Sequence, residues 1–159
     1  MGLGDNGPLR NAEDYRVARK EITFDGTAGK GLVGSNVVWF TVTGMVEIQW
    51  CIGQVGAVQL NSLGGPPGTG TLNLGFISNP GAFVGNTTVN GTTNFVVGAI
   101  WVSITPTLFS VAQLTGMKFG FSNGQNVISV VNTNNVIAGV LTMICRWKPF
   151  SDGGLLVPA

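Results

Sequence analysis

The chain has 159 residues, with eight basic residues, seven acidic residues, no histidine and a net charge of +1. Charged residues make up 9% of it, against about 25% in a typical soluble domain, and ten of the fifteen lie in residues 1–30. This balance predicts neither a nucleic-acid nor a membrane partner. A body with so few charges has little to keep copies apart, so we expect it to be covered by copies of itself or by a large partner.

The apolar residues occur in runs that Gly, Asn and Thr interrupt at strand length. None of the runs approaches the ~18 uninterrupted apolar residues of a membrane-spanning helix. The first residues lack the basic and apolar regions of a secretory signal, so we expect synthesis in a reducing cytoplasm. Cys51 and Cys145 lie in strand-like runs. They are expected to be buried free thiols, with a disulfide only if the protein meets oxidising conditions.

The N-terminal segment predicts an arm followed by a first element. Residues 1–11 are rich in Gly, Asn and Pro and have no periodicity, which is typical of an extended arm. Asn11 precedes two acidic residues and resembles a helix N-cap, so a short helix from Ala12 to about Lys20 is one alternative. The alternation of the following residues favours a strand from about Arg19 to Phe24 instead.

The stretch Val33–Val55 contains two β-branched and aromatic runs that meet at Thr43-Gly44. This pattern predicts a β-hairpin. A two-residue loop would pair Val42 with Met45, whereas a longer loop would shift the register by one and exchange the two faces. With the two-residue loop, one face forms continuous core because side chains two apart share a face. Its members are Val37, Trp39, Val46, Ile48, Trp50 and Ile52.

Short strand candidates continue to the C-terminus. They are Thr71–Ser78, Thr87–Val89, Ala99–Thr105, Met117–Ser122, Val127–Asn132 and Val140–Trp147. Turns are expected at Asn79-Pro80-Gly81, Asn90-Gly91, Asn123-Gly124 and 132–135. After residue 20 only Thr107–Leu114 could hold a helical turn. This spacing predicts an all-β protein, an antiparallel β-sandwich or a jelly-roll-like barrel with an extended N-terminal arm. The expected division is an arm at 1–25, a body at 26–150 and a surface tail at 151–159.

The residues offer little for catalysis. Histidine, the usual base at neutral pH, is absent. The carboxylates outside the arm, Glu47 and Asp152, are far apart in sequence, and the cysteines fit no zinc spacing. No serine lies in a nucleophile elbow. We therefore predict a non-enzyme with no cofactor and no metal.

The four tryptophans admit two interpretations. On an exposed face they could stack against sugars, but Trp39 and Trp50 are predicted core neighbours, so packing is the favoured use. Similarly, Arg146-Trp147-Lys148 could contact an anion or a protein, but the end of a strand closing against solvent is favoured.

Four glycine-anchored patterns resemble small structural proteins of tailed bacteriophages, of the type that decorates or cements the head. They are Gly26-Thr27-Ala28-Gly29 with Gly31 and Val33-Gly34, Phe40-Thr41-Val42-Thr43-Gly44, Ala99-Ile100-Trp101-Val102, and Gly139-Val140-Leu141 with Cys145-Arg146-Trp147-Lys148-Pro149. The resemblance implies capsid decoration by a β-rich body, often trimeric, that is attached through a terminal segment. The partners would be the major capsid protein and other copies of the chain, and the location would be the capsid surface after synthesis in the host cytoplasm.

Two alternatives remain open, namely a receptor- or carbohydrate-binding module of a viral fibre and a tail-tube or connector subunit. The arm concentrates charge in a span that can order on a partner, although a solubilising tail without a partner would have the same composition. The residues expected to bind the capsid are Arg10, Glu13, Asp14, Arg16, Arg19 and Lys20. The residues expected to form the core or the oligomer contact are Trp39, Phe40, Trp50, Trp101 and Trp147.

Overall fold

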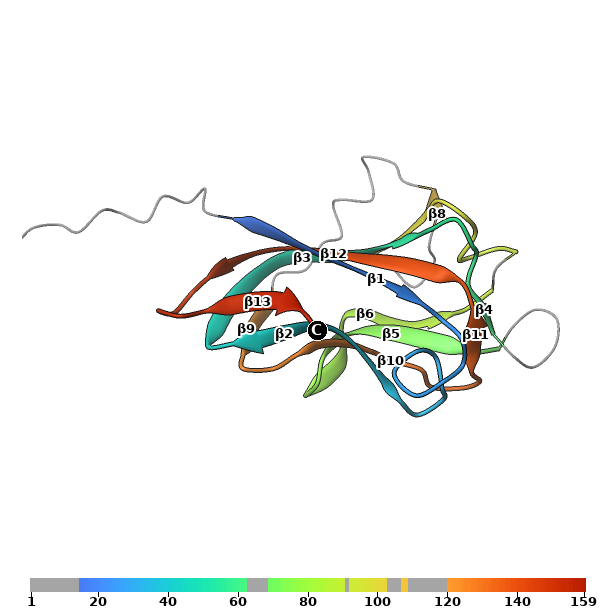
Figure 1. Ribbon diagram of the computed structural model, residues 1–159, viewed down its shortest axis with the longest axis horizontal. Helices are drawn as coiled ribbons and strands as arrows, with labels where there is room; N and C mark the ends of the chain where they lie inside the picture. Colours follow the sequence, from blue (N-terminus) through green and yellow to red (C-terminus); the bar gives the residue numbers. More distant parts are fainter. Residues whose placement is uncertain (1–14, 63–68, 91, 103–106, 109–119) are drawn as a thin grey trace, which may run out of the picture.

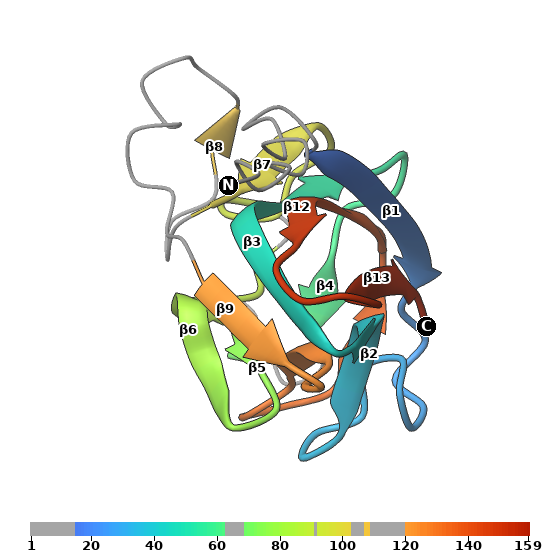
Figure 2. The same ribbon diagram turned by 90° about the vertical axis from the view of Figure 1, so that its left-hand side faces the viewer.

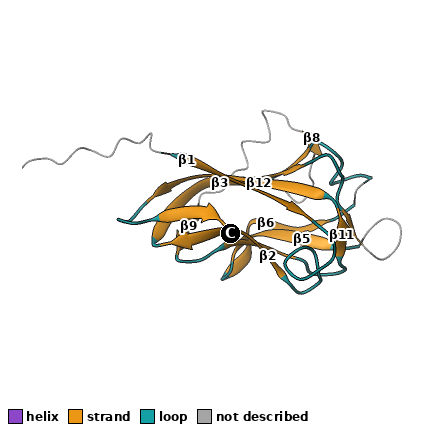
Figure 3. Cartoon of the chain, viewed as in Figure 1, coloured by secondary structure: helices purple, strands orange, loops and turns teal. Residues whose placement is uncertain are grey.

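The computed structural model describes residues 15–62, 69–90, 92–102, 107–108 and 120–159. These residues form antiparallel β-strands and no helix (Figure 3). Two sheets pack face to face as a sandwich (Figure 1). This confirms the predicted all-β class. Within the described part of the chain no helix is long and apolar enough to cross a bilayer.

The first sheet has the strand order β1 (Arg16–Thr23), β12 (Val140–Pro149), β3 (Met45–Val55), β7 (Ala99–Trp101) and β8 (Thr107–Leu108), and β9 (Gly120–Asn123) pairs with the beginning of β3. The second sheet has the order β13 (Leu155–Pro158), β2 (Asn36–Thr43), β10 (Val127–Val130), β5 (Thr71–Phe76) and β6 (Asn79–Thr88). A small third sheet pairs β4 (Asn61–Ser62) with β11 (Val136–Ala138). The strand expected at Val140–Trp147 is present as β12.

The predicted hairpin between β2 and β3 is wrong. Both strands form where expected, but β2 pairs with β10 and β13 in the second sheet, while β3 pairs with β12 in the first. The chain crosses from one sheet to the other at Gly44, whose φ of +60° suits glycine. An added Cβ at Gly44 would lie 3.1 Å from the Ser151 Oγ atom. The two apolar strands therefore face each other across the core.

A β-bulge in each of these strands changes which side chains reach the core. On β3, Arg146 faces Trp50 and Trp147 faces Ile48, so Gln49 is the extra residue. The bulge turns Cys51 inward and leaves Trp50 half-buried on the outer face. The prediction that Trp50 is a core residue is therefore wrong. On β2 the extra residue is Trp39, which lets both Trp39 and Phe40 be buried.

The core confirms the other predicted aromatic positions. Trp39, Phe40 and Trp101 are fully buried, and Trp147 is 3% exposed. The indole Nε1 of Trp39 donates to the Ser129 Oγ atom at 2.8 Å, and that of Trp101 donates to the Thr87 Oγ1 atom at 2.9 Å. Each buried indole thus has a polar partner, which removes the cost of burying its N–H group.

Both ends of the described chain belong to the sandwich, which corrects two predicted boundaries. β1 pairs with β12 from Arg16 onward, so the body begins before residue 26 and the helix alternative fails for Arg16–Lys20. β13 pairs with β2, and Leu156 is 3% exposed, so the segment 151–159 is not a separate surface tail. β1 and β13 lie on the same side of the sandwich (Figure 2).

Two smaller expectations also change. The turn expected at Asn79-Pro80-Gly81 lies two residues earlier, because the hairpin of β5 and β6 turns at Ile77-Ser78. An added Cβ at Gly75 would lie 2.2 Å from the Asn79 carbonyl oxygen, so the start of β6 lies close over Gly75. Of the run Thr107–Leu114, the first two residues form β8 and the rest lies outside the described residues.

Candidate partner-binding face

The six residues predicted to bind a partner do not form one group in the structure. Arg10, Glu13 and Asp14 lie outside the described residues. Arg16 and Arg19 are exposed on β1. Since alternate side chains of a strand point to opposite faces, Arg19 lies on the outer face of the first sheet, and the neighbouring Lys20 points inward.

Lys20 is used inside the protein. Its Nζ atom donates to the Val38 carbonyl at 2.9 Å and to the Ala159 carbonyl at 2.6 Å. These bonds cross from β1 to the second sheet and close the side of the sandwich. Desolvation lowers the pKa of the Lys20 ammonium. Lys20 is therefore a structural bridge between the sheets, and its predicted role in binding a partner stays a prediction.

The outer face carries a charged cluster where β1 begins, and we call Tyr15, Glu47, Arg146 and Lys148 the Tyr15 cluster. The Tyr15 hydroxyl donates to the Glu47 Oε1 atom at 2.5 Å. The Lys148 Nζ atom lies 3.1 Å from the Glu47 Oε2 atom, and these two side chains are 29% and 14% exposed. The carboxylate of Glu47 thus has a separate partner on each oxygen.

The Tyr15 ring also contacts two cations. The Arg146 Cζ atom lies 4.8 Å from the ring centroid, and the Lys148 Nζ atom lies 4.9 Å from it. Both distances are within the range of cation–π attraction. Next to the cluster, the Arg16 Cζ atom lies 5.5 Å from the Trp147 ring. These contacts fix Tyr15 on β3 and β12, which positions the start of β1.

The contacts shift three pKa values in the directions that stabilise the charged network. The hydrogen bond from Tyr15, together with Lys148, lowers the pKa of Glu47 although burial opposes this. The hydrogen bond with Glu47 raises the pKa of Tyr15, and burial adds to the effect. The bond to Glu47 also raises the pKa of Lys148. At neutral pH the cluster therefore contains an ionised carboxylate, a protonated phenol and an ammonium group.

Beside the cluster, most side chains of the outer face are apolar. The strand register puts Val17, Arg146 and Trp50 in one row and Arg19, Ile144 and Ile52 in the next. Val17 is 64% exposed, while Trp50, Ile52 and Ile144 are half-buried. The face therefore combines apolar side chains with two exposed or half-exposed arginines, Arg19 and Arg146.

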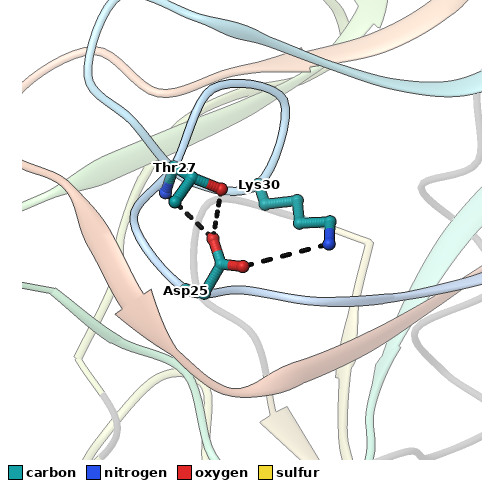
Figure 4. Close-up of polar contacts among 3 residues, drawn as sticks. All are labelled: Asp25, Thr27 and Lys30. Atoms are coloured by element: carbon teal, nitrogen blue, oxygen red, sulfur yellow. Dashed lines mark hydrogen bonds and ion pairs between the residues drawn. The ribbon is translucent and has the colours of Figure 1, made fainter.

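The opposite end of β1 leads into a different kind of polar site. Asp25 Oδ1 accepts hydrogen bonds from the Thr27 N–H at 2.9 Å and the Thr27 hydroxyl at 2.5 Å (Figure 4). The Lys30 Nζ atom is 3.9 Å from Asp25 Oδ2, with both side chains about half exposed. A groove of about 500 Å³ lies nearby, between β1 and β2. These contacts fold the loop onto itself, as Asp side chains do in turns.

The described residues contain no group of three or more His, Cys, Asp or Glu side chains that could hold a metal ion. Cys51 and Cys145 are buried free thiols, as expected. The non-enzyme assignment stays a prediction.

Sequence reasoning missed Tyr15 and Glu47. Glu47 is the only acidic residue between Asp25 and Asp152, and Arg146 and Lys148 are two of the three cations between Lys30 and the C-terminus. An isolated carboxylate within a strand needs a nearby cation, which was the available signal.

The chain was compared with protein-family models, curated proteins and solved structures, and nothing matches it.

Proposed function

We propose that the protein is a non-enzymatic structural protein that decorates a larger assembly, with the outer face of its first sheet and the segment before Tyr15 turned toward the partner. The observation that carries this proposal is the Tyr15 cluster. It anchors β1 at the point where the chain continues toward Arg10, Glu13 and Asp14. Charged groups held in fixed positions give a contact its register and specificity.

The identity of the assembly rests on the sequence resemblance, which makes it the head of a tailed phage with the major capsid protein as the partner. The apolar part of the outer face supports a contact with another protein, because aromatic and apolar side chains are enriched at the core of an interface. It consists of the exposed Val17 and the half-buried Trp50, Ile52 and Ile144. We propose that the protein also associates with itself, as a trimer by the same resemblance. Light scattering should then give a mass well above the 16.5 kDa of one chain, and a mass near that value would contradict self-association.

The test is co-sedimentation with empty phage heads that lack the protein. Deletion of residues 1–14 stops before Tyr15 and leaves the Tyr15 cluster and β1 intact. The truncated chain should remain folded and oligomeric, but its binding to heads should fall strongly. Binding by the full chain should weaken as salt rises, because exposed charge pairs are screened.

A matched pair of substitutions tests the outer face itself. Arg19→Ser and Lys30→Ser each remove one exposed cation, but Arg19 lies on the outer face and Lys30 in the loop at the other end of β1. We expect Arg19→Ser to weaken head binding and Lys30→Ser to leave it unchanged. Equal effects of the two variants would count against this face. Retention of the protein on a polysaccharide column without head binding would favour the fibre-module alternative.

A further inference from the structure

The two cysteines face each other across neighbouring strands. Cys51 on β3 and Cys145 on β12 are direct partners in the strand register, and both side chains point into the core, with 6% and 0% exposure. They are also the only cysteines in the chain, so no other thiol competes for pairing within one molecule.

The hydrogen-bond pattern shows which kind of antiparallel pair they form. One step beyond the Val55–Leu141 pair, Gly56 donates its N–H to the Val140 carbonyl at 2.7 Å, while the Val140 N–H bonds to the Val58 carbonyl at 2.9 Å. The Gly56 N–H therefore points toward β12, as it does at a hydrogen-bonded position of the ladder. Hydrogen-bonded and non-hydrogen-bonded pairs alternate along an antiparallel ladder. Cys51 lies five positions before Gly56, an odd number, and no register shift intervenes, so Cys51 and Cys145 form a non-hydrogen-bonded pair.

The pairing of β12 with β1, its neighbour on the other side, also indicates that Cys51 and Cys145 form a non-hydrogen-bonded pair. Phe24 donates its N–H to the Gly139 carbonyl at 2.8 Å, one step beyond the Thr23–Val140 pair. Six residues further along β12, Cys145 must then exchange hydrogen bonds with Ala18 on β1. The backbone groups of Cys145 therefore point toward β1 and away from β3, as a non-hydrogen-bonded pairing with Cys51 requires.

This kind of pair has the spacing that a disulfide needs. Facing Cα atoms in a non-hydrogen-bonded pair are about 4.5 Å apart, with the side chains close together. Disulfides span Cα distances of about 4.4–6.8 Å. We propose that Cys51 and Cys145 form an intramolecular disulfide when the protein folds in the presence of a small-molecule disulfide such as oxidised glutathione. This inference does not depend on the proposed function.

The chemistry balances through two exchange steps. One protein thiolate attacks oxidised glutathione, forms a mixed disulfide and releases one glutathione. The second protein thiolate then attacks the mixed disulfide, forms the Cys51–Cys145 bond and releases a second glutathione, so two protein thiols are oxidised and one glutathione disulfide is reduced. Burial and the contact with Cys51 raise the pKa of the Cys145 thiol. Exchange is therefore slow in the closed core and proceeds as β3 and β12 come together during folding.

The bond would join the two strands that hold Glu47 and Lys148. It closes a loop from residue 51 to residue 145, and long loops give large stabilisation in the chain-entropy description of a disulfide. The fold thus accommodates two free thiols in a reducing cytoplasm and a Cys51–Cys145 disulfide in an oxidising medium.

In the test, the reduced full-length chain is refolded from urea into a glutathione redox buffer, quenched with acid and alkylated in denaturant, and its intact mass is then measured. We expect a monomer that has lost two hydrogen atoms and takes up no alkylating reagent. Trypsin should then release residues 31–118 linked to residues 119–146, because Lys30, Lys118 and Arg146 are consecutive cleavage sites. In urea at the same glutathione ratio, the ratio of disulfide to dithiol should be lower by roughly tenfold or more.

The melting temperature provides an independent measurement. The disulfide form should melt roughly 10 °C higher than the dithiol form. Cys51→Ala and Cys145→Ala are the controls, and neither should form an internal disulfide or show this shift. Three results would overturn the proposal: two free thiols per chain when the product refolded in the glutathione buffer is alkylated in denaturant, disulfide-linked dimers as the main product, or a disulfide form that melts below the dithiol form.

Discussion

The two ends of β1 carry a lysine–carboxylate pair each, and the pairs differ in nearly every physical respect. At the beginning of the strand, the Lys148 Nζ atom lies 3.1 Å from the Glu47 Oε2 atom, both side chains are largely shielded from solvent, and the Tyr15 hydroxyl donates to the other carboxylate oxygen, Oε1. At the other end, Lys30 and Asp25 are 3.9 Å apart and about half exposed. The first pair is held by two strands of one sheet, whereas the second lies within a single loop.

The comparison shows that the position of a charged side chain in the fold, more than its residue type, decides how much it contributes to stability. An exposed pair is screened by water and salt and contributes little. A carboxylate with a bond on each oxygen, shielded by neighbouring strands, contributes more because its removal leaves partly buried partners unsatisfied. We therefore expect the Tyr15 end to matter for both stability and binding, and the Asp25 end to matter for neither.

The largest loss of stability is expected for a substitution in the core between the two sheets. Trp39→Ala removes a fully buried indole and leaves Ser129 without its hydrogen-bond donor, so it should cost about 3–5 kcal/mol of unfolding free energy. Trp50→Ala is the matched control, since Trp50 is half-buried on the outer face. Urea unfolding should show a clearly smaller loss for Trp50→Ala. Equal losses would contradict the assignment of the two side chains to different faces.

Glu47→Gln should have the next largest effect. The change keeps the size of the side chain but removes the charge that holds Tyr15 and Lys148, and it should cost about 1–2 kcal/mol. Asp25→Asn is the corresponding change at the other end, and its unfolding midpoint in urea should coincide with that of the unchanged protein. A Glu47→Gln variant with the same midpoint would show that the Tyr15 cluster does not stabilise the sheet.

The loss of stability in acid should differ between the unchanged protein and Glu47→Gln. The pKa of Glu47 is lowered in the folded protein, so its contribution to stability is fully present above the unfolded value near 4.5 and is lost as pH falls through the folded value. The unchanged protein should therefore lose more stability than Glu47→Gln as pH falls from about 5 through the lowered pKa of Glu47. Parallel stability curves for the two proteins in this window would contradict the prediction.

The smallest effect is expected at the exposed cations. Arg19→Ser and Lys30→Ser should both leave the melting temperature unchanged, because exposed charges outside a network contribute little. Their difference should appear only in head binding, as described above. A drop in melting temperature for Arg19→Ser alone would give Arg19 a structural role in the first sheet and would make its binding effect indirect.

Local sequence pattern was sufficient to predict the strand class and many strand positions. β-branched and aromatic runs, interrupted by Gly and Asn, identified β2, β3, β10 and β12, since these preferences act over a few neighbouring residues. The same pattern identified Trp39 and Trp101 as core residues and predicted that Cys51 and Cys145 would be buried thiols.

Pairing was decided only by the tertiary structure. Both faces of β2 and β3 are apolar, so the sequence fits a hairpin as well as it fits two strands facing each other across a core, and Gly44 can make either connection. The bulges at Trp39 and Gln49 then moved Phe40 inward and Trp50 outward, which no period-two pattern anticipates. The Tyr15 cluster and the facing cysteines follow from the pairing of β1, β12 and β3, strands more than 85 residues apart at their β12 contacts. Such long-range contacts leave no local signal because they depend on which strands meet.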